Sequence, residues 1–401
     1  AEDGIRDYKV TGVQTCALPI SVLMRSRQVI ALVLLAFVPL SATAERLQWG
    51  DGAIFLTSVL AILPLAVWLS TATEELSLAL GPNIGALLNA LFGNATELII
   101  ALTALRAGLV GIVKASITGT VMANLLLALG LSMLVGGIGR REQTFQPVVA
   151  RVNGSAMTLA VLAILIPSLT SLDPLQSAAG NAAFSRFVAW LLLLVYGLTL
   201  VFSLRTHRSL YDVAQVDSAG EVPDASQAGS AAALSQNSQG HPEHRPPLLP
   251  WLLVLLAATL GIAYESELFV GVVETVSEGF GLSAIFTGVV LLPLLGGVAE
   301  YLTAVTMARR NKMDLAVSVA LGSTLLVALL VVPVLVLVGP LLGHPLDLSF
   351  NPYELVAIAT AVVVSNLASL DGRSDWLEGA LLLAAYLILA AGFFFQNTPI
   401  A

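Results

Sequence analysis

Two glutamates stand inside long apolar stretches of this sequence. Glu97 lies within residues 82–105, and Glu300 lies within residues 283–307. A carboxylate at membrane depth is costly, so a residue of this kind is by default a candidate functional group. The pair predicts a single ion site to which both carboxylates contribute.

Glycines and an amide accompany the two glutamates. Asn94 lies three positions before Glu97, so a helix would place both on one face. Glycine lets a helix open, and opened turns expose carbonyl oxygens that can bind ions. Such oxygens suit a hard cation such as Ca²⁺, which takes about 6–8 of them, and no soft ligand for copper or zinc lies nearby. The residues predicted to form the site are Glu97, Glu300, Asn94, Gly93, Gly296 and Gly297.

One offset of 203 residues relates the two halves of the chain. It pairs, without a gap, Glu75 with Glu278, Glu97 with Glu300, and Gly119 with Gly322. Because glutamate is rare inside membranes, the first two coincidences indicate an internal repeat. Each half holds five predicted spans, and an odd number inserts the second half upside down. Inverted-topology repeats are typical of secondary transporters, which bind substrate near the midplane where the repeats meet.

The composition is that of a membrane protein. Of 401 residues, 57% are hydrophobic and 11% charged, against roughly 25% charged in soluble domains. Apolar runs near the spanning length of about 20 residues predict eleven spans, at 28–44, 52–72, 82–105, 109–136, 148–169, 183–204, 249–273, 283–307, 314–339, 353–370 and 376–395. The predicted fold class is an all-α polytopic membrane protein with two inverted five-helix repeats after an N-terminal helix.

The ends and the middle of the chain divide it further. Residues 1–20 resemble a sequencing-library adapter translated in frame and are expected to be non-native, a genuine short tail being the alternative. They hold the single cysteine, Cys16, so thiol chemistry is excluded elsewhere. Residues 21–48 are predicted as a membrane helix, although a signal peptide also fits. The first repeat is placed at 49–205, a flexible loop, either a linker or a cation sensor, at 206–248, and the second repeat at 249–401.

Basic residues give the expected orientation. One side collects twelve of them, namely Arg25, Arg27, Arg140, Arg141, Arg151, Arg205, Arg208, Arg245, Arg309, Arg310, Lys312 and Arg373. The other side collects four, namely Arg46, Arg106, Lys114 and Arg186. The N-terminus is therefore predicted inside and the C-terminus outside, in a bacterial inner membrane. The expected partners are inorganic cations and lipid, with no nucleic acid, and the oligomeric state stays open.

Further polar residues are candidates for a proton or cation pathway. Ser116, Thr120 and Asn124 recur at every fourth position of the span 109–136, although hydroxyl residues also serve helix packing. Glutamates near the ends of segments could relay protons or could be solvated helix-end charges. The candidate set is Glu74, Glu75, Glu267, Glu278, Ser116, Thr120, Asn124, Ser323 and Thr324.

The motifs resemble those of the calcium/proton antiporters of the calcium/cation antiporter superfamily. Residues 87–101, which include Gly93-Asn94-Ala95-Thr96-Glu97, carry most of the resemblance in the first half. The family's second motif usually reads Gly-Asn-Ala-Ala-Glu-His, whereas this chain reads Gly296-Gly297-Val298-Ala299-Glu300-Tyr301. The second half-site therefore keeps its carboxylate but lacks an amide and an imidazole. The family also tends to have glutamine where Lys114 stands.

The resemblance implies exchange of Ca²⁺ for H⁺ by alternating access, without a cofactor. Glu97 and Glu300 would bind either one Ca²⁺ or protons. The missing amide and imidazole leave Na⁺/H⁺ or another cation/proton exchange open, and a passive cation channel is the rival from another class. An intramembrane hydrolase lacks a catalytic constellation, because the predicted spans hold no histidine, cysteine or aspartate pair.

Overall fold

The computed structural model describes residues 33–173, 175, 177–206 and 247–396, and the expectations for residues 1–20 and for nearly all of 206–248 fall outside these ranges. The first half holds α2 (Phe37–Arg46), α3 (Asp51–Leu80), α4 (Pro82–Phe92), α5 (Ala95–Arg106), α6 (Val110–Met122), the π-helix η1 (Ala123–Ala128), α7 (Leu129–Gly137), β1 (Gln143–Thr144), α8 (Pro147–Thr170), α9 (Ala178–Val201) and the π-helix η2 (Phe202–Thr206). The second half holds α11 (Leu248–Gly279), α12 (Ala284–Phe286), the π-helix η4 (Thr287–Leu291), α13 (Leu292–Gly296), α14 (Val298–Arg309), α15 (Met313–Leu326), the π-helix η5 (Val327–Val331), α16 (Val332–Val338), the 3₁₀-helix η6 (Gly339–Leu342), α17 (Pro352–Ala368), β2 (Arg373–Ser374) and α18 (Trp376–Phe395).

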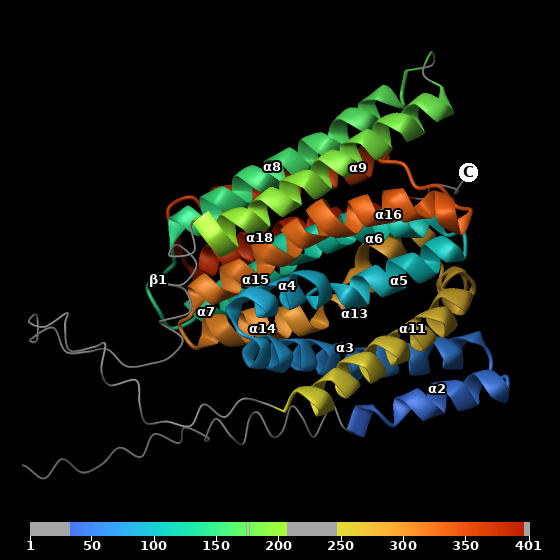
Figure 1. The fold of residues 1–401 in the computed structure, drawn as a ribbon. Helices are drawn as coiled ribbons and strands as arrows, with labels where there is room; N and C mark the ends of the chain where they lie inside the picture. Colours follow the sequence, from blue (N-terminus) through green and yellow to red (C-terminus); the bar gives the residue numbers. More distant parts are fainter. Residues whose placement is uncertain (1–32, 174, 176, 207–246, 397–401) are drawn as a thin grey trace, which may run out of the picture.

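The helices form a bundle with three parts (Figure 1). The pair α8 and α9 lies along one side, and α2, α3 and α11 lie along the opposite side. The short helices α4, α5, α13 and α14 lie between these two groups. Because α3 and α11 pack along each other, one helix from each half forms the wall beside the short helices.

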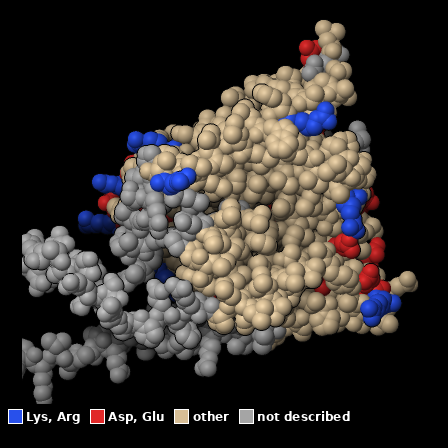
Figure 2. Space-filling model, in the orientation of Figure 1, with Lys and Arg blue, Asp and Glu red and all other residues tan. Residues whose placement is uncertain are grey.

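Apolar helices and an uncharged belt show a membrane protein. Among the described residues, seven helices are long and apolar enough to cross a membrane, and eight if the bent pair α13–α14 counts as one span. On the face that Figure 2 shows, the charged side chains of the described residues gather at two ends, and the surface between them is free of them. Large apolar side chains on the outer helices are exposed, among them Trp190, Leu194, Leu387 and Ile388. The helical membrane class is confirmed, whereas the count of eleven spans stays a prediction.

The predicted repeat extends to the bounds of the helices. Shifting α5 by 203 residues gives 298–309, which are the bounds of α14. The same shift moves the start of α6 to 313, where α15 begins. It also moves the π-helical turn η1 to 326–331, over η5. A π-helical turn at equivalent places in both halves is notable because such turns are rare and frequently mark functional sites.

A two-stranded sheet closes one end of the bundle. β1 pairs antiparallel with β2, with Gln143 opposite Ser374 and Thr144 opposite Arg373. The buried Gln143 side chain donates hydrogen bonds from Nε2 to the carbonyl of Ala308 at 2.9 Å. The sheet therefore ties the loop after α7 to the end of α14 and fixes the far end of the helix that carries Glu300.

Candidate cation site

Both glutamates lie in the first turn of a helix that starts at a break. α4 ends at Phe92 and α5 begins at Ala95, which makes Glu97 the third residue of α5. α13 ends at Gly296 and α14 begins at Val298, and the helical segments Ala284–Gly296 and Val298–Arg309 are bent by 61°. A carboxylate in the first turn of a helix faces the positive end of the helix dipole. The helix breaks at the glycine motifs thus place each carboxylate at the positive end of a helix dipole.

The two motifs meet through Glu97 and Gly296. A β-carbon placed on Gly296 would lie 2.9 Å from Cγ and 3.3 Å from Oε1 of Glu97. The carboxylate of the first half therefore packs directly on the backbone of the second half's broken helix. Glycine at this position provides the space in which the Glu97 side chain lies.

One oxygen of each glutamate is buried and unpaired. Oε2 of Glu97 and Oε2 of Glu300 accept no hydrogen bond from any described residue. Buried polar atoms nearly always have a partner, so an exception needs an explanation. A bound cation or a proton would satisfy these oxygens. The described residues contain no cluster of three or more histidine, cysteine or acidic side chains, so further ligands would have to be neutral oxygens.

Two amides from the first half converge on a serine of the second half. Asn94 Nδ2 donates to Ser323 Oγ at 2.8 Å, and Asn124 Nδ2 donates to the same oxygen at 3.0 Å. All three side chains are buried. Since a hydroxyl oxygen has two lone pairs, Ser323 is fully used as an acceptor and bridges the amides. Each amide keeps a carbonyl oxygen as a candidate ligand.

The second half-site is filled by a tyrosine. The buried Tyr301 donates from its hydroxyl to the carbonyl of Pro293 at 2.8 Å, so its ring folds back across the break. A β-carbon on Gly297 would lie 2.4 Å from Cζ of this ring. The second motif has glycine in place of the family's amide at position 297 and tyrosine in place of its imidazole at position 301. The two differences are linked, because the Tyr301 ring occupies the space that a side chain at position 297 would need.

The other pathway candidates differ in burial and in the partners of their side chains. Ser116 and Thr324 donate to carbonyls of their own helices, at 3.0 Å and 2.9 Å, as packing residues do. Glu267 is exposed and forms an ion pair with Arg106. Four further candidates differ in exposure: Thr120 is buried, Glu75 is half-buried, and Glu74 and Glu278 are exposed. A pathway role for these residues stays a prediction.

The sequence reading missed a buried carboxylate on α11. Glu265 is fully buried, and its Oε1 accepts a hydrogen bond from Ser41 of α2 at 2.6 Å. Its Oε2 is buried without a partner among the described residues. The signal was present, because Glu265 is a carboxylate within the apolar run 249–273, as Glu97 is within its own run. The comparison of the two halves did not reveal Glu265, because the residue 203 positions before it is Ile62 and not a second carboxylate.

A second missed feature is the partner of Lys114. Lys114 Nζ donates to Asp347 Oδ1 at 2.5 Å and to the carbonyl of Ser349 at 2.7 Å. Burial raises the pKa of Asp347, but hydrogen bonds from Lys114 and from the Ser349 hydroxyl outweigh it and hold the pKa below its usual range. Asp347, in the loop before α17, thus balances the positive charge of Lys114 in α6.

Buried glutamates where α5 and α14 begin, inside an apolar helical bundle, are typical of an ion-transport protein. The chain belongs to the sodium/calcium exchanger protein family, whose model matches residues 51–205 and 250–395. This confirms the resemblance to cation antiporters and the expectation of a transporter and not an enzyme.

Curated relatives match over almost their full length. A protein of Aphanothece halophytica named Ca²⁺/H⁺ antiporter is 48% identical over 379 residues, covering 93% of this chain and 98% of the relative. A protein of Synechocystis with the same name is 48% identical over 378 residues, covering 94% and 100%. The Ca²⁺/H⁺ antiporter ChaA of Bacillus subtilis is 40% identical over 360 residues, covering 90% and 97%.

Solved structures share the fold. The structure of native YfkE superposes with a TM-score of 0.76 at 37% identity, covering 92% of this chain and 100% of that chain. The H⁺/Ca²⁺ exchanger CAX superposes with a TM-score of 0.63 at 15% identity, covering 92% of each chain. The second comparison bears on the fold alone.

Proposed function

We propose that this protein is a secondary active transporter that exchanges Ca²⁺ for H⁺ by alternating access, with Glu97 and Glu300 as the shared site. The observation that carries the proposal is the buried, unpaired Oε2 of each glutamate beside a helix break. The contact of Glu97 with Gly296 supports a single site built from both halves. The names of the relatives at 48% identity supply the ions.

Competition at one site accounts for exchange. The two carboxylates, when ionised, offer two negative charges and a set of oxygens that suits Ca²⁺. Protons make both carboxyl groups neutral and remove the attraction for the cation. Ca²⁺ on two carboxylates and protons on both leave the site with the same net charge, so either form can cross the apolar interior. A mixed or empty site keeps an uncompensated charge in that interior, which is costly.

The proposal includes eleven spans and inverted repeats. The short helices α2 and α17 and the broken pairs α4–α5 and α13–α14 supply the four spans beyond the seven long ones. With this count, the two halves enter the membrane in opposite senses, and Glu97 and Glu300 approach the site from opposite sides. The excess of basic residues then places the β1–β2 end on the cytoplasmic side, in a bacterial inner membrane.

The test is Ca²⁺ uptake into proteoliposomes under an imposed pH gradient. Glu97→Gln and Glu300→Gln keep the side-chain size but remove the charge, and each should abolish uptake and the coupled proton movement. Glu142→Gln, on an exposed loop glutamate, is the matched control and should transport normally.

Three outcomes decide against the proposal. Normal exchange by Glu97→Gln rejects the site. Uptake that persists without a pH gradient and follows the Ca²⁺ gradient alone indicates a channel. Competition by Na⁺ at concentrations comparable to those of Ca²⁺ assigns the protein to the other cation/proton exchangers.

A further inference from the structure

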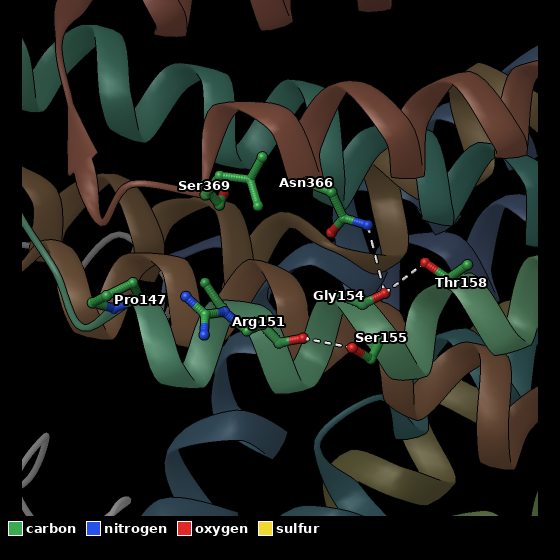
Figure 3. A pocket seen from close by; sticks show the side chains of 9 residues that line it. Pro147, Arg151, Gly154, Ser155, Thr158, Asn366 and Ser369 are labelled. Carbon is green, nitrogen blue, oxygen red and sulfur yellow. Dashed lines mark hydrogen bonds between the residues drawn. The ribbon is translucent and has the colours of Figure 1, made fainter.

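A small pocket lies between the start of α8 and the end of α17. Its volume is about 170 Å³, and its lining includes Arg151, Ser155, Thr158, Asn366 and Ser369 (Figure 3). It adjoins the sheet, because β1 leads into α8 and α17 leads into β2. The pocket joins one helix of each half at the end of the bundle where most basic residues are predicted.

Two hydrogen-bond donors in this pocket have no partner among the described residues. Ser369 is 4% exposed, and its Oγ is buried without a hydrogen bond. The guanidinium of Arg151 is exposed and forms no ion pair within the described ranges. By contrast, Ser155 and Thr158 donate to carbonyls along α8, at 3.0 Å and 2.9 Å.

This arrangement suits an anion with several oxygens. Asn366 donates only a long bond of 3.5 Å to the carbonyl of Gly154, and an amide carries a second hydrogen. An arginine, a serine and an amide residue therefore line one space, and no acidic residue lines it. Arginine is suited to phosphate because its planar fork can bind two oxygens at once.

The surroundings indicate a lipid as the source of the phosphate. Leu367 and Leu370 beside the pocket are 64% and 57% exposed, as on the lipid-facing surface of other helices. The volume lies below the roughly 300–1,000 Å³ of typical small-molecule pockets, so a headgroup phosphate fits while acyl chains extend along the leucines. We propose that this pocket binds the phosphate of an anionic phospholipid, bridging α8 and α17.

The proposal can be tested on the purified full chain in detergent. Thermal unfolding is followed during titration with short-chain phosphatidylglycerol and, in parallel, with inorganic phosphate. We expect a saturable rise in Tm with the lipid and none with phosphate at equal concentration. Losing a charge-assisted hydrogen bond costs enough to weaken binding about tenfold, so Arg151→Gln should raise the apparent Kd by at least that factor. Ser369→Ala should raise it about threefold to tenfold.

A neighbouring arginine provides the control. Arg141 is exposed at the same end, outside the pocket lining, and Arg141→Gln should leave the Kd unchanged. An unchanged Kd in Arg151→Gln overturns the proposal, and so does an equal loss in Arg141→Gln, which would indicate attraction by the surface charge in general. Equal stabilisation by inorganic phosphate overturns the lipid assignment. If Arg151→Gln fails to fold, Ser369→Ala decides, because its small change stays inside the pocket and an unchanged Kd overturns the proposal.

Discussion

The substitution Gly297→Ala tests how the second half-site is built. The backbone at Gly297 has φ −87° and ψ 6°, which any L-residue can adopt, so alanine brings no backbone strain. Its β-carbon, however, would lie 2.4 Å from Cζ and Oη of Tyr301 and 2.8 Å from Cε1. The ring has to leave, and the hydrogen bond to the carbonyl of Pro293 is lost with it.

The expected cost follows from these two effects. Overpacking a buried site costs about 1–3 kcal/mol, and a lost hydrogen bond costs about 0.5–1.5 kcal/mol. Together they give about 2–4 kcal/mol, which corresponds to a fall in Tm of roughly 2–5 °C for a chain of this length. Glu300 lies one turn away on the same helix, so Ca²⁺ affinity should fall as well.

A double-mutant cycle isolates the contact. Tyr301→Ala removes the ring and is destabilising by itself, because it leaves a cavity. In that background Gly297→Ala meets no ring and should be neutral, so the coupling between the two positions should be about 2–4 kcal/mol. In a Tyr301→Phe background the ring remains, and Gly297→Ala should still destabilise. The measurement is thermal unfolding of the purified protein, with Ca²⁺-dependent uptake in parallel.

Two results would refute this reasoning. One is an unchanged Tm for Gly297→Ala in the otherwise native chain. The other is the same loss of stability in the presence and absence of the Tyr301 ring, because additive effects exclude a direct contact.

Other substitutions test the remaining contacts. Gly296→Ala should fold, because the flexible Glu97 side chain can move aside. Uptake assays should show about a tenfold loss of Ca²⁺ affinity, since this movement displaces one ligand. An unchanged affinity would exclude the contact between Glu97 and Gly296. Asp347→Asn weakens the link to Lys114 and should lower Tm by a few degrees at pH 7. Because the pKa of Asp347 is held low, its contribution exists above the usual aspartate range and disappears as pH falls through the lowered pKa, so the difference in Tm should vanish in acid. Ser323→Ala removes the shared acceptor of two buried amides and should lower Tm by about 2–5 °C; an unaltered Tm would show that the bridge contributes nothing.

The sequence predicted the main features of the site because glutamate and glycine are informative inside apolar helices. Glu97 and Glu300 could be identified because a carboxylate inside an apolar span is energetically costly. The offset of 203 residues then related the two positions to each other. The same offset reproduces the bounds of α5 and α14, which no hydropathy pattern gives. The glycine motifs indicated the helix breaks because glycine tolerates them.

What the sequence could not give are contacts between distant segments. The partners Lys114 and Asp347 are 233 positions apart, and the carboxylate lies in a loop, outside the apolar spans, where it carries no signal. Ser323 was expected to line a pathway, yet only packing shows that both amides occupy its lone pairs. The role of Tyr301 depends on a rotamer that folds back over its own helix break, and spacing along the chain does not determine rotamers.

The contact between Tyr301 and Gly297 also constrains the order in which this sequence could have changed. Glycine at position 297 is compatible with many residues at position 301, whereas a tyrosine in this orientation is incompatible with any β-carbon at position 297. In a lineage that began with asparagine and histidine at these positions, the glycine had to arise before the tyrosine or together with it. If the two changes came one after the other, the intermediate held glycine with histidine, and a sequence with asparagine and tyrosine has to place the ring elsewhere.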